Sequence, residues 1–108
     1  MNLNKLKLYN KYKNINFPNK ELIYIGVDNE NDYWFLYKYE NTNAYFSTLK
    51  YNGFDTDKIA KELNLEIFID RCDDKYFNGY YFGWYKKEYI EINLKPILKN
   101  KLNNIINR

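Results

Sequence analysis

Residues 22–40 read LIYIGV-DNEND-YWFLYKYE, two apolar and aromatic runs on either side of five polar residues. Both runs are short and rich in Ile, Tyr, Phe and Trp, the residue types that favour β-strands. The polar segment 28–32 is typical of a turn. The stretch therefore predicts two consecutive antiparallel strands. In the second strand, alternation places four aromatic residues on one face: Tyr33, Phe35, Tyr37 and Tyr39.

Weaker patterns on either side complete an expected α+β fold. The further elements are a helix over residues 3–15, a strand over 44–51, a helix over 56–64 capped by Asp55 or Thr56, a strand over 65–69, a hairpin of 79–85 with 88–93, and a final helix from residue 94. The alternation Leu6-Lys7-Leu8 also permits a strand in the first of these. The expected order is α-βββ-α-βββ-α, a mostly antiparallel sheet of about five to six strands with three helices packed on one face.

Length and composition limit the class of protein. A chain of 108 residues, 45% hydrophobic and 29% charged, predicts one globular domain over residues 1–108. The longest run of aromatic or aliphatic residues is 33–37, far short of the ~20 that a transmembrane helix needs. The amino-terminal residues lack the apolar core and cleavage site of a signal peptide. Together with a single cysteine, Cys72, these features predict a cytoplasmic protein.

Aromatic residues are concentrated in two windows. Fifteen of the 22 lie in residues 33–46 and 76–89. Part of the excess of Tyr and Lys reflects codon usage, because Asn, Lys, Ile, Tyr and Phe, all encoded by A/T-rich codons, supply 64 of the 108 residues. Position is more informative than number: each window holds more aromatic residues than one buried strand face can use, so several tyrosines should be exposed.

Catalytic residue types are scarce. The chain has no His, one Ser (Ser47) and one Cys, so neither the hydroxyl nor the thiol has a histidine to activate it. The same counts exclude a zinc site of the His/Cys type. The four glycines form no phosphate-binding or dinucleotide-binding loop. We therefore expect a protein that is not an enzyme and that needs neither cofactor nor metal.

Two groups of carboxylates could nevertheless hold a hard metal ion. Asp28, Glu30 and Asp32 have the spacing of the first ligands in a calcium loop, but tyrosines stand where that loop needs Gly and Glu, so a solvated turn is favoured. Magnesium beside a phosphoryl group is the other case, and a metal-dependent phosphoryl-transfer enzyme is accordingly the second alternative function. Its candidate ligands are Asp70, Asp73 and Asp74.

Charge is unevenly distributed along the chain. Residues 1–20 carry five lysines and residues 94–108 carry four basic residues, both without an acid, whereas residues 21–93 have a net charge of −6. These lysines can form solvated faces of the terminal helices, or a nucleic-acid footprint if they gather on one face. A small nucleic-acid-binding module that uses basic terminal helices is the first alternative function.

Protein binding is favoured over base stacking, because Arg is rare and the lysines of the aromatic strands are accompanied by acids. The chain resembles, in type and without a shared motif, the small inhibitors that phages and mobile elements direct against bacterial defence systems. That resemblance implies an anti-CRISPR-like protein that blocks a host protein or protein–nucleic acid complex by occlusion, with direct nucleic-acid contact allowed and no membrane involved. The partner-binding residues that we expect are Tyr33, Tyr37, Tyr39, Tyr80, Tyr81, Trp84, Tyr85, Lys86 and Lys87.

Overall fold

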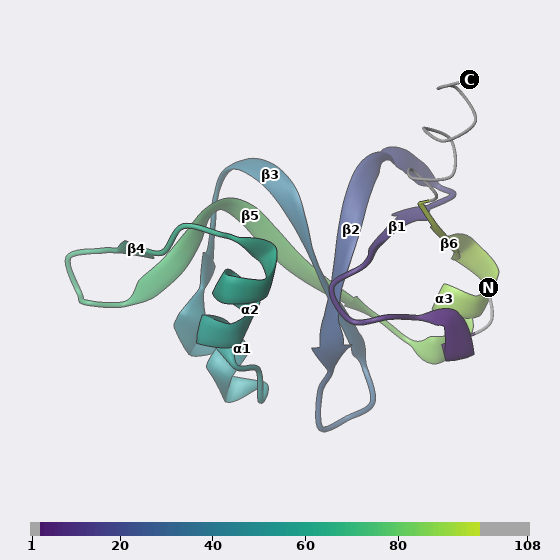
Figure 1. Ribbon diagram of the computed structural model, residues 1–108, viewed down its shortest axis with the longest axis horizontal. Helices are drawn as coiled ribbons and strands as arrows, with labels where there is room; N and C mark the ends of the chain where they lie inside the picture. The colour runs from purple at the N-terminus through teal and green to yellow at the C-terminus, as the bar shows by residue number, and fades with distance from the viewer. Residues whose placement is uncertain (1–2, 98–108) are drawn as a thin grey trace, which may run out of the picture.

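The computed structural model describes residues 3–97, which form six strands, three α-helices and one 3-10 helix (Figure 1). In chain order these elements are η1 (Leu3–Lys5), β1 (Lys11–Asn14), β2 (Phe17–Val27), β3 (Tyr33–Tyr45), α1 (Phe46–Tyr51), α2 (Thr56–Leu63), β4 (Phe68–Ile69), β5 (Lys75–Tyr85), α3 (Lys87–Asn93) and β6 (Leu94–Pro96). The strands form one sheet in the order β4-β5-β3-β2-β1-β6, and every neighbouring pair is antiparallel. The predicted α+β class with an antiparallel sheet is confirmed.

The hairpin predicted from residues 22–40 forms the middle of this sheet as β2 and β3. Ile23 pairs with Leu36, and Tyr24 pairs with Phe35. The register then shifts at Gly26, whose φ of 127° is a conformation that residues with a Cβ rarely adopt. The bulge bends the hairpin just before its turn.

Both faces of β3 are buried at residues 34–36, and this feature organises the core. Trp34 and Leu36 enter one apolar cluster with α1 and α2, whereas Phe35 between them enters a second cluster with α3, β1 and β6. Because successive strand residues point to opposite faces, residues 34–36, which are buried on both faces, must all be apolar. The helices therefore cover both faces, not the single face expected, and Figure 1 shows α1 and α2 at one end of the sheet and α3 at the other.

The helix expected over residues 3–15 is wrong, because this segment forms η1 and β1. Tyr12 and Asn14 are buried while Lys11 and Lys13 are exposed, which is the two-residue period of a strand. β1 lies between β2 and β6 and pairs with both. Hydrogen bonding to two neighbouring strands decides the conformation here, since the apolar helical pattern of the segment is weak.

The separate strand expected over residues 44–51 is also wrong, because β3 continues to Tyr45 and is followed by α1. Phe46 and Leu49 are three residues apart, and both enter the cluster between the sheet and α2. A helix brings residues at this spacing to one face, whereas a strand would separate them. Packing against the sheet therefore overrides the strand preference of this segment.

The helix expected over residues 56–64 is confirmed as α2, and Asp55 caps it. The Asp55 carboxylate accepts a hydrogen bond of 3.1 Å from the backbone N–H of Lys58. Asn64 ends the helix in the left-handed conformation, with φ 54° and ψ 48°. Local signals agree at both ends of this element, which is why it was predictable.

The hairpin expected from 79–85 and 88–93 is wrong. The first segment belongs to β5, which pairs with β3, and the second forms α3. Ile90 is fully buried, whereas Ile92, on the same side of a hypothetical strand, is 74% exposed. The strand expected over 65–69 shortens to the two residues of β4.

The helix expected from residue 94 is wrong at its start, where β6 pairs with β1; its remainder from residue 98 lies outside the described residues. Pro96 is compatible with a position on the outermost strand, because an edge strand can lack one hydrogen-bond donor. Within residues 3–97, no helix has the length and apolar character needed to span a membrane.

Candidate functional site: an aromatic edge and a basic face

β5 leaves a long edge of the sheet without a neighbouring strand among the described residues. β4 pairs only with Lys75 and Tyr76, so residues 77–85 have β3 on one side and no strand on the other. These residues include neither a charged side chain nor a proline. Proteins commonly use charges or proline to protect such an edge from association, and this edge carries aromatic rings instead.

The rings lie around the edge on both faces of the sheet. Tyr81 shares a face with Tyr37, while Phe82 packs against the cluster on the opposite face. The rings of Tyr81 and Phe82 nevertheless stack, with centroids 5.3 Å apart and planes 9° apart. Since β3 occupies the inner side of β5, side chains from opposite faces can meet only beyond the outer edge.

Three of the rings at this edge are substantially exposed. The exposed fractions are 57% for Tyr39, 42% for Tyr81 and 52% for Trp84. Trp84 stacks on the buried Trp34 with centroids 5.1 Å apart, and Tyr81 meets Tyr39 edge-on at 6.2 Å. We call the surface formed by Tyr39, Tyr81, Phe82 and Trp84 the aromatic edge.

A second group of rings lies beside Tyr37, which is half-buried. Lys20 of β2 places its Nζ 4.5 Å from the centre of the Tyr37 ring and 5.3 Å from that of Phe17. Burial raises the pKa of Tyr37, and the neighbouring hydroxyls of Tyr81, Tyr85 and Tyr39 add to this effect. Sequence reasoning missed Phe17 and Lys20, because they stand on a different strand from the aromatic windows and next to Pro18.

The other tyrosines predicted to bind a partner are half-buried parts of the core. Tyr33 stacks on Tyr24, with centroids 6.2 Å apart, and Tyr80 packs against the cluster beneath α1 and α2. Tyr85 stacks on Tyr89 with centroids 4.7 Å apart, and its hydroxyl accepts a hydrogen bond of 3.3 Å from the buried Asn14. These tyrosines therefore pack mainly against the core and contribute less to the exposed surface than Tyr39, Tyr81 and Trp84 do.

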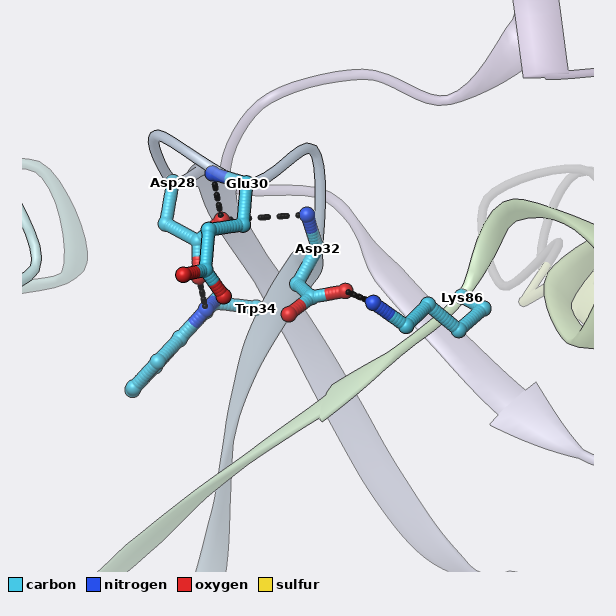
Figure 2. Close-up of polar contacts among 5 residues, drawn as sticks. All are labelled: Asp28, Glu30, Asp32, Trp34 and Lys86. Atoms are coloured by element: carbon cyan, nitrogen blue, oxygen red, sulfur yellow. Dashed lines mark hydrogen bonds and ion pairs between the residues drawn. The ribbon is translucent and has the colours of Figure 1, made fainter.

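Lys86 forms an ion pair that ties the start of α3 to the β2–β3 turn (Figure 2). Its Nζ lies 2.6 Å from Oδ1 of Asp32, whose side chain is only 8% exposed. The hydrogen bond and the charge of Asp32 raise the pKa of Lys86 above its ordinary value. Lys87, the first residue of α3, is exposed. Lys86 therefore has a structural partner within the chain.

Asp28 organises the same turn by accepting three hydrogen bonds (Figure 2). Desolvation opposes ionisation of this carboxyl, but the hydrogen bond from the indole of Trp34, those from the backbone of Asp32 and Glu30, and the charge of Lys86 hold its pKa below the ordinary value. The favoured interpretation of residues 28–32 as a turn is confirmed.

The acidic loop after β4 is a second hydrogen-bonded turn. Oδ1 of Asp70 accepts from the backbone N–H groups of Cys72 and Asp74, at 2.8 Å and 3.1 Å. Oδ2 of Asp74 accepts from the hydroxyl of Ser47 at 2.9 Å. Across residues 3–97, no three His, Cys, Asp or Glu side chains are arranged to hold a metal ion.

Neither protein-family models, nor curated proteins, nor solved structures gave a match to this chain. Its function must therefore be argued from its own surfaces. Two stand out: the aromatic edge, and a lysine-bearing surface over β6, β1 and the ends of β2 and β3.

Proposed function

We propose that this chain is a non-enzymatic binding protein that docks a partner protein on the aromatic edge. The observation that carries the proposal is the exposure of Tyr39, Tyr81 and Trp84 along a sheet edge that has no charged residue from 77 to 85. Tyr and Trp are enriched at protein interfaces because they offer a large contact area at low entropic cost.

The exposed rings are held in place before any partner arrives. Trp84 rests on Trp34, which is 4% exposed, and Tyr81 contacts Tyr37, Tyr39 and Phe82. Side chains that are already ordered lose less entropy on binding. A surface of this kind suits a tight, rigid contact more than an adaptable one.

Occlusion of a host-defence protein or nucleoprotein is the finer form of this proposal. It rests on the small size of the chain and its lack of a nucleophile–histidine pair, and it predicts a partner whose own nucleic-acid access is blocked. Purification of the partner with and without nuclease separates a protein contact from one bridged by nucleic acid.

The decisive experiment compares tagged wild-type protein with the double variant Tyr81→Ala/Trp84→Ala. Tyr51→Ala is the matched control, because Tyr51 is 88% exposed on α1 and forms no part of the aromatic edge. Proteins captured from cells of the source organism are identified by mass spectrometry, and the affinity of the purified pair is then measured by calorimetry.

We expect each alanine to weaken binding by about 2 kcal/mol, roughly 30-fold, as for aromatic residues at the centre of an interface. Hydrogen exchange of residues 77–85 should slow when the partner is bound. Both variants should retain the circular dichroism of the wild type, since the removed rings are half exposed. A folded double variant that binds as tightly as Tyr51→Ala would refute the proposal.

A further inference from the structure

The fold separates charge between two parts of the molecule. Strands β1, β2, β3 and β6 carry five lysines and two glutamates, a net charge of +3, while the remaining described residues carry nine basic and twelve acidic groups, a net charge of −3. A potential concentrated in this way attracts ligands of the opposite charge. The described part of the chain is neutral overall, and its excess of positive charge lies in β1 and β6, two segments far apart in the sequence that the fold brings together.

Strand pairing brings the two basic ends of the chain together. Lys13 of β1 lies opposite Lys95 of β6 on one side and opposite Glu21 of β2 on the other. Lys11 stands two residues from Lys13 on the same face, and its Nζ is 3.4 Å from Glu21. Like charges on directly opposite strand positions are destabilising, so this arrangement gains from an anionic ligand.

A hollow of about 440 Å³ opens beside these lysines. Lys11, Lys20, Lys38, Tyr80 and the Glu21 that pairs with Lys11 line it from the sheet, and Leu63 and Leu65 at the end of α2 also contribute to its wall. Its size lies in the range of sites that hold a small ligand group. A second hollow of similar volume, around Phe17 and Pro18, shares Asn19, Lys20 and Lys38 with the first. The two hollows form a path across the ends of β2 and β3.

An exposed ring stands at the far end of this path. Phe17 is 54% exposed, and the ammonium group of Lys20 lies between it and the ring of Tyr37. Aromatic faces interleaved with lysines along a groove are what proteins use to bind unpaired bases and the phosphates that join them.

We propose that this basic path binds single-stranded nucleic acid. The phosphates contact Lys11, Lys13, Lys20 and Lys38, and a base stacks on Phe17. The proposal is independent of partner binding at the aromatic edge, because the two surfaces use different side chains. It also uses strands in place of the terminal helices of the sequence-based alternative, since β1 stands where the first helix was expected and β6 at the start of the second.

Fluorescence anisotropy with a labelled oligothymidylate tests this site. Lys11 is already paired with Glu21, so the phosphates neutralised are those beside Lys13, Lys20 and Lys38. With these three phosphates neutralised, the slope of log K against log salt should be about −2, so that affinity falls about 15-fold from about 50 to about 200 mM salt. The variant Lys13→Ala/Lys20→Ala/Lys38→Ala should lose both the affinity and the slope. The control Lys50→Ala/Lys58→Ala/Lys75→Ala makes the same change in net charge at exposed lysines elsewhere and should bind as the wild type does.

A variant that lacks the stacking ring distinguishes recognition of bases from attraction to negative charge alone. Phe17→Ala should weaken oligothymidylate binding about tenfold without changing the salt slope, whereas Tyr51→Ala should have no effect. A polyglutamate peptide of equal charge and a DNA duplex should both bind more weakly than the single strand. Any of four results would overturn the proposal: no binding at low salt, an equal loss of affinity in the control lysine variant, wild-type affinity in Phe17→Ala, or an affinity for polyglutamate or duplex equal to that for the single strand.

Discussion

Replacing Asp28 by alanine should destabilise the protein, because this carboxylate holds three donors at once. Its Oδ2 accepts from Nε1 of Trp34 at 2.7 Å, and its Oδ1 accepts from the backbone N–H groups of Glu30 and Asp32 at 2.8 Å and 3.0 Å. Trp34 is 4% exposed and belongs to the core beneath α1 and α2. Without the carboxylate, its indole N–H would be left in the core without an acceptor.

The cost follows from these contacts. A buried donor left without a partner costs about 1–3 kcal/mol, and the two amides in the turn, which water can reach, add about 1 kcal/mol together. The expected loss is therefore about 2–4 kcal/mol, a large part of the roughly 5–15 kcal/mol that stabilises a protein of this size. The melting temperature should fall by about 10 °C or more.

Urea denaturation of four proteins tests the reasoning: wild type, Asp28→Ala, Trp34→Phe and the double variant. The Trp34→Phe background has no indole N–H that could lose its acceptor. Asp28→Ala should therefore cost about 1–2 kcal/mol less stability there than in the wild type. Asn29→Ala, an exposed change in the same turn, should cost little. Equal costs of Asp28→Ala in both backgrounds would refute the assignment of the penalty to the indole.

The pH dependence provides a second check on Asp28. Its pKa is lowered in the folded protein, so its ionised form contributes stability above the unfolded pKa of about 3.9. This contribution is lost as the pH falls through the lower pKa of the folded state. The stability difference between wild type and Asp28→Ala should accordingly be constant near neutral pH and shrink in acid. A stability difference that grows in acid would contradict a lowered pKa of Asp28 in the folded protein.

Three further predictions concern single positions. Gly26→Ala should lower stability by about 1–3 kcal/mol in chemical denaturation, because φ is 127° and a Cβ would lie 3.2 Å from the ring of Phe54. Asp55→Ala should cost about 1 kcal/mol in the same assay through loss of the α2 cap, and Asp55→Asn should restore most of it. Burial raises the pKa of Tyr24 to about 12, so stability should decline as the pH rises from the unfolded value towards the folded one. Tyr24→Phe should flatten this alkaline decline, and an unchanged slope would contradict the assignment.

The parts of the fold that could be predicted are those where local signals agree. Residues 22–40 combine strand-forming residues with a turn, and α2 has both a cap and helical spacing. α1 and α3 could not be predicted, because each is a short segment whose aromatic and branched residues favour strands. What makes them helical is the position of Phe46, Leu49 and Ile90 against the sheet, which is a property of the assembled core.

The candidate surfaces were predictable only in part. Strand alternation is enough to place Tyr81 and Trp84 on opposite faces of β5. It does not show that both faces of β3 are buried, and this burial takes Tyr33 and Tyr85 into the core and leaves the exposed rings at the outer edge. No sequence pattern around Phe17 and Lys20 indicates a binding surface, because Lys20 meets the Tyr37 ring only through the pairing of β2 with β3.

The sequence by itself determined the antiparallel α+β class, the central hairpin and the scarcity of catalytic groups, since these depend on residue type and near-neighbour spacing. Tertiary structure alone decided which aromatic residues remain exposed and that the basic segments near the two ends of the chain lie side by side. The physical reason is strand pairing. β1 and β6 come from opposite ends of the chain, and their hydrogen bonds place Lys13 opposite Lys95. Within residues 3–97, β5 likewise has no outer neighbour beyond Tyr76, which leaves Tyr81 and Trp84 at the edge of the sheet.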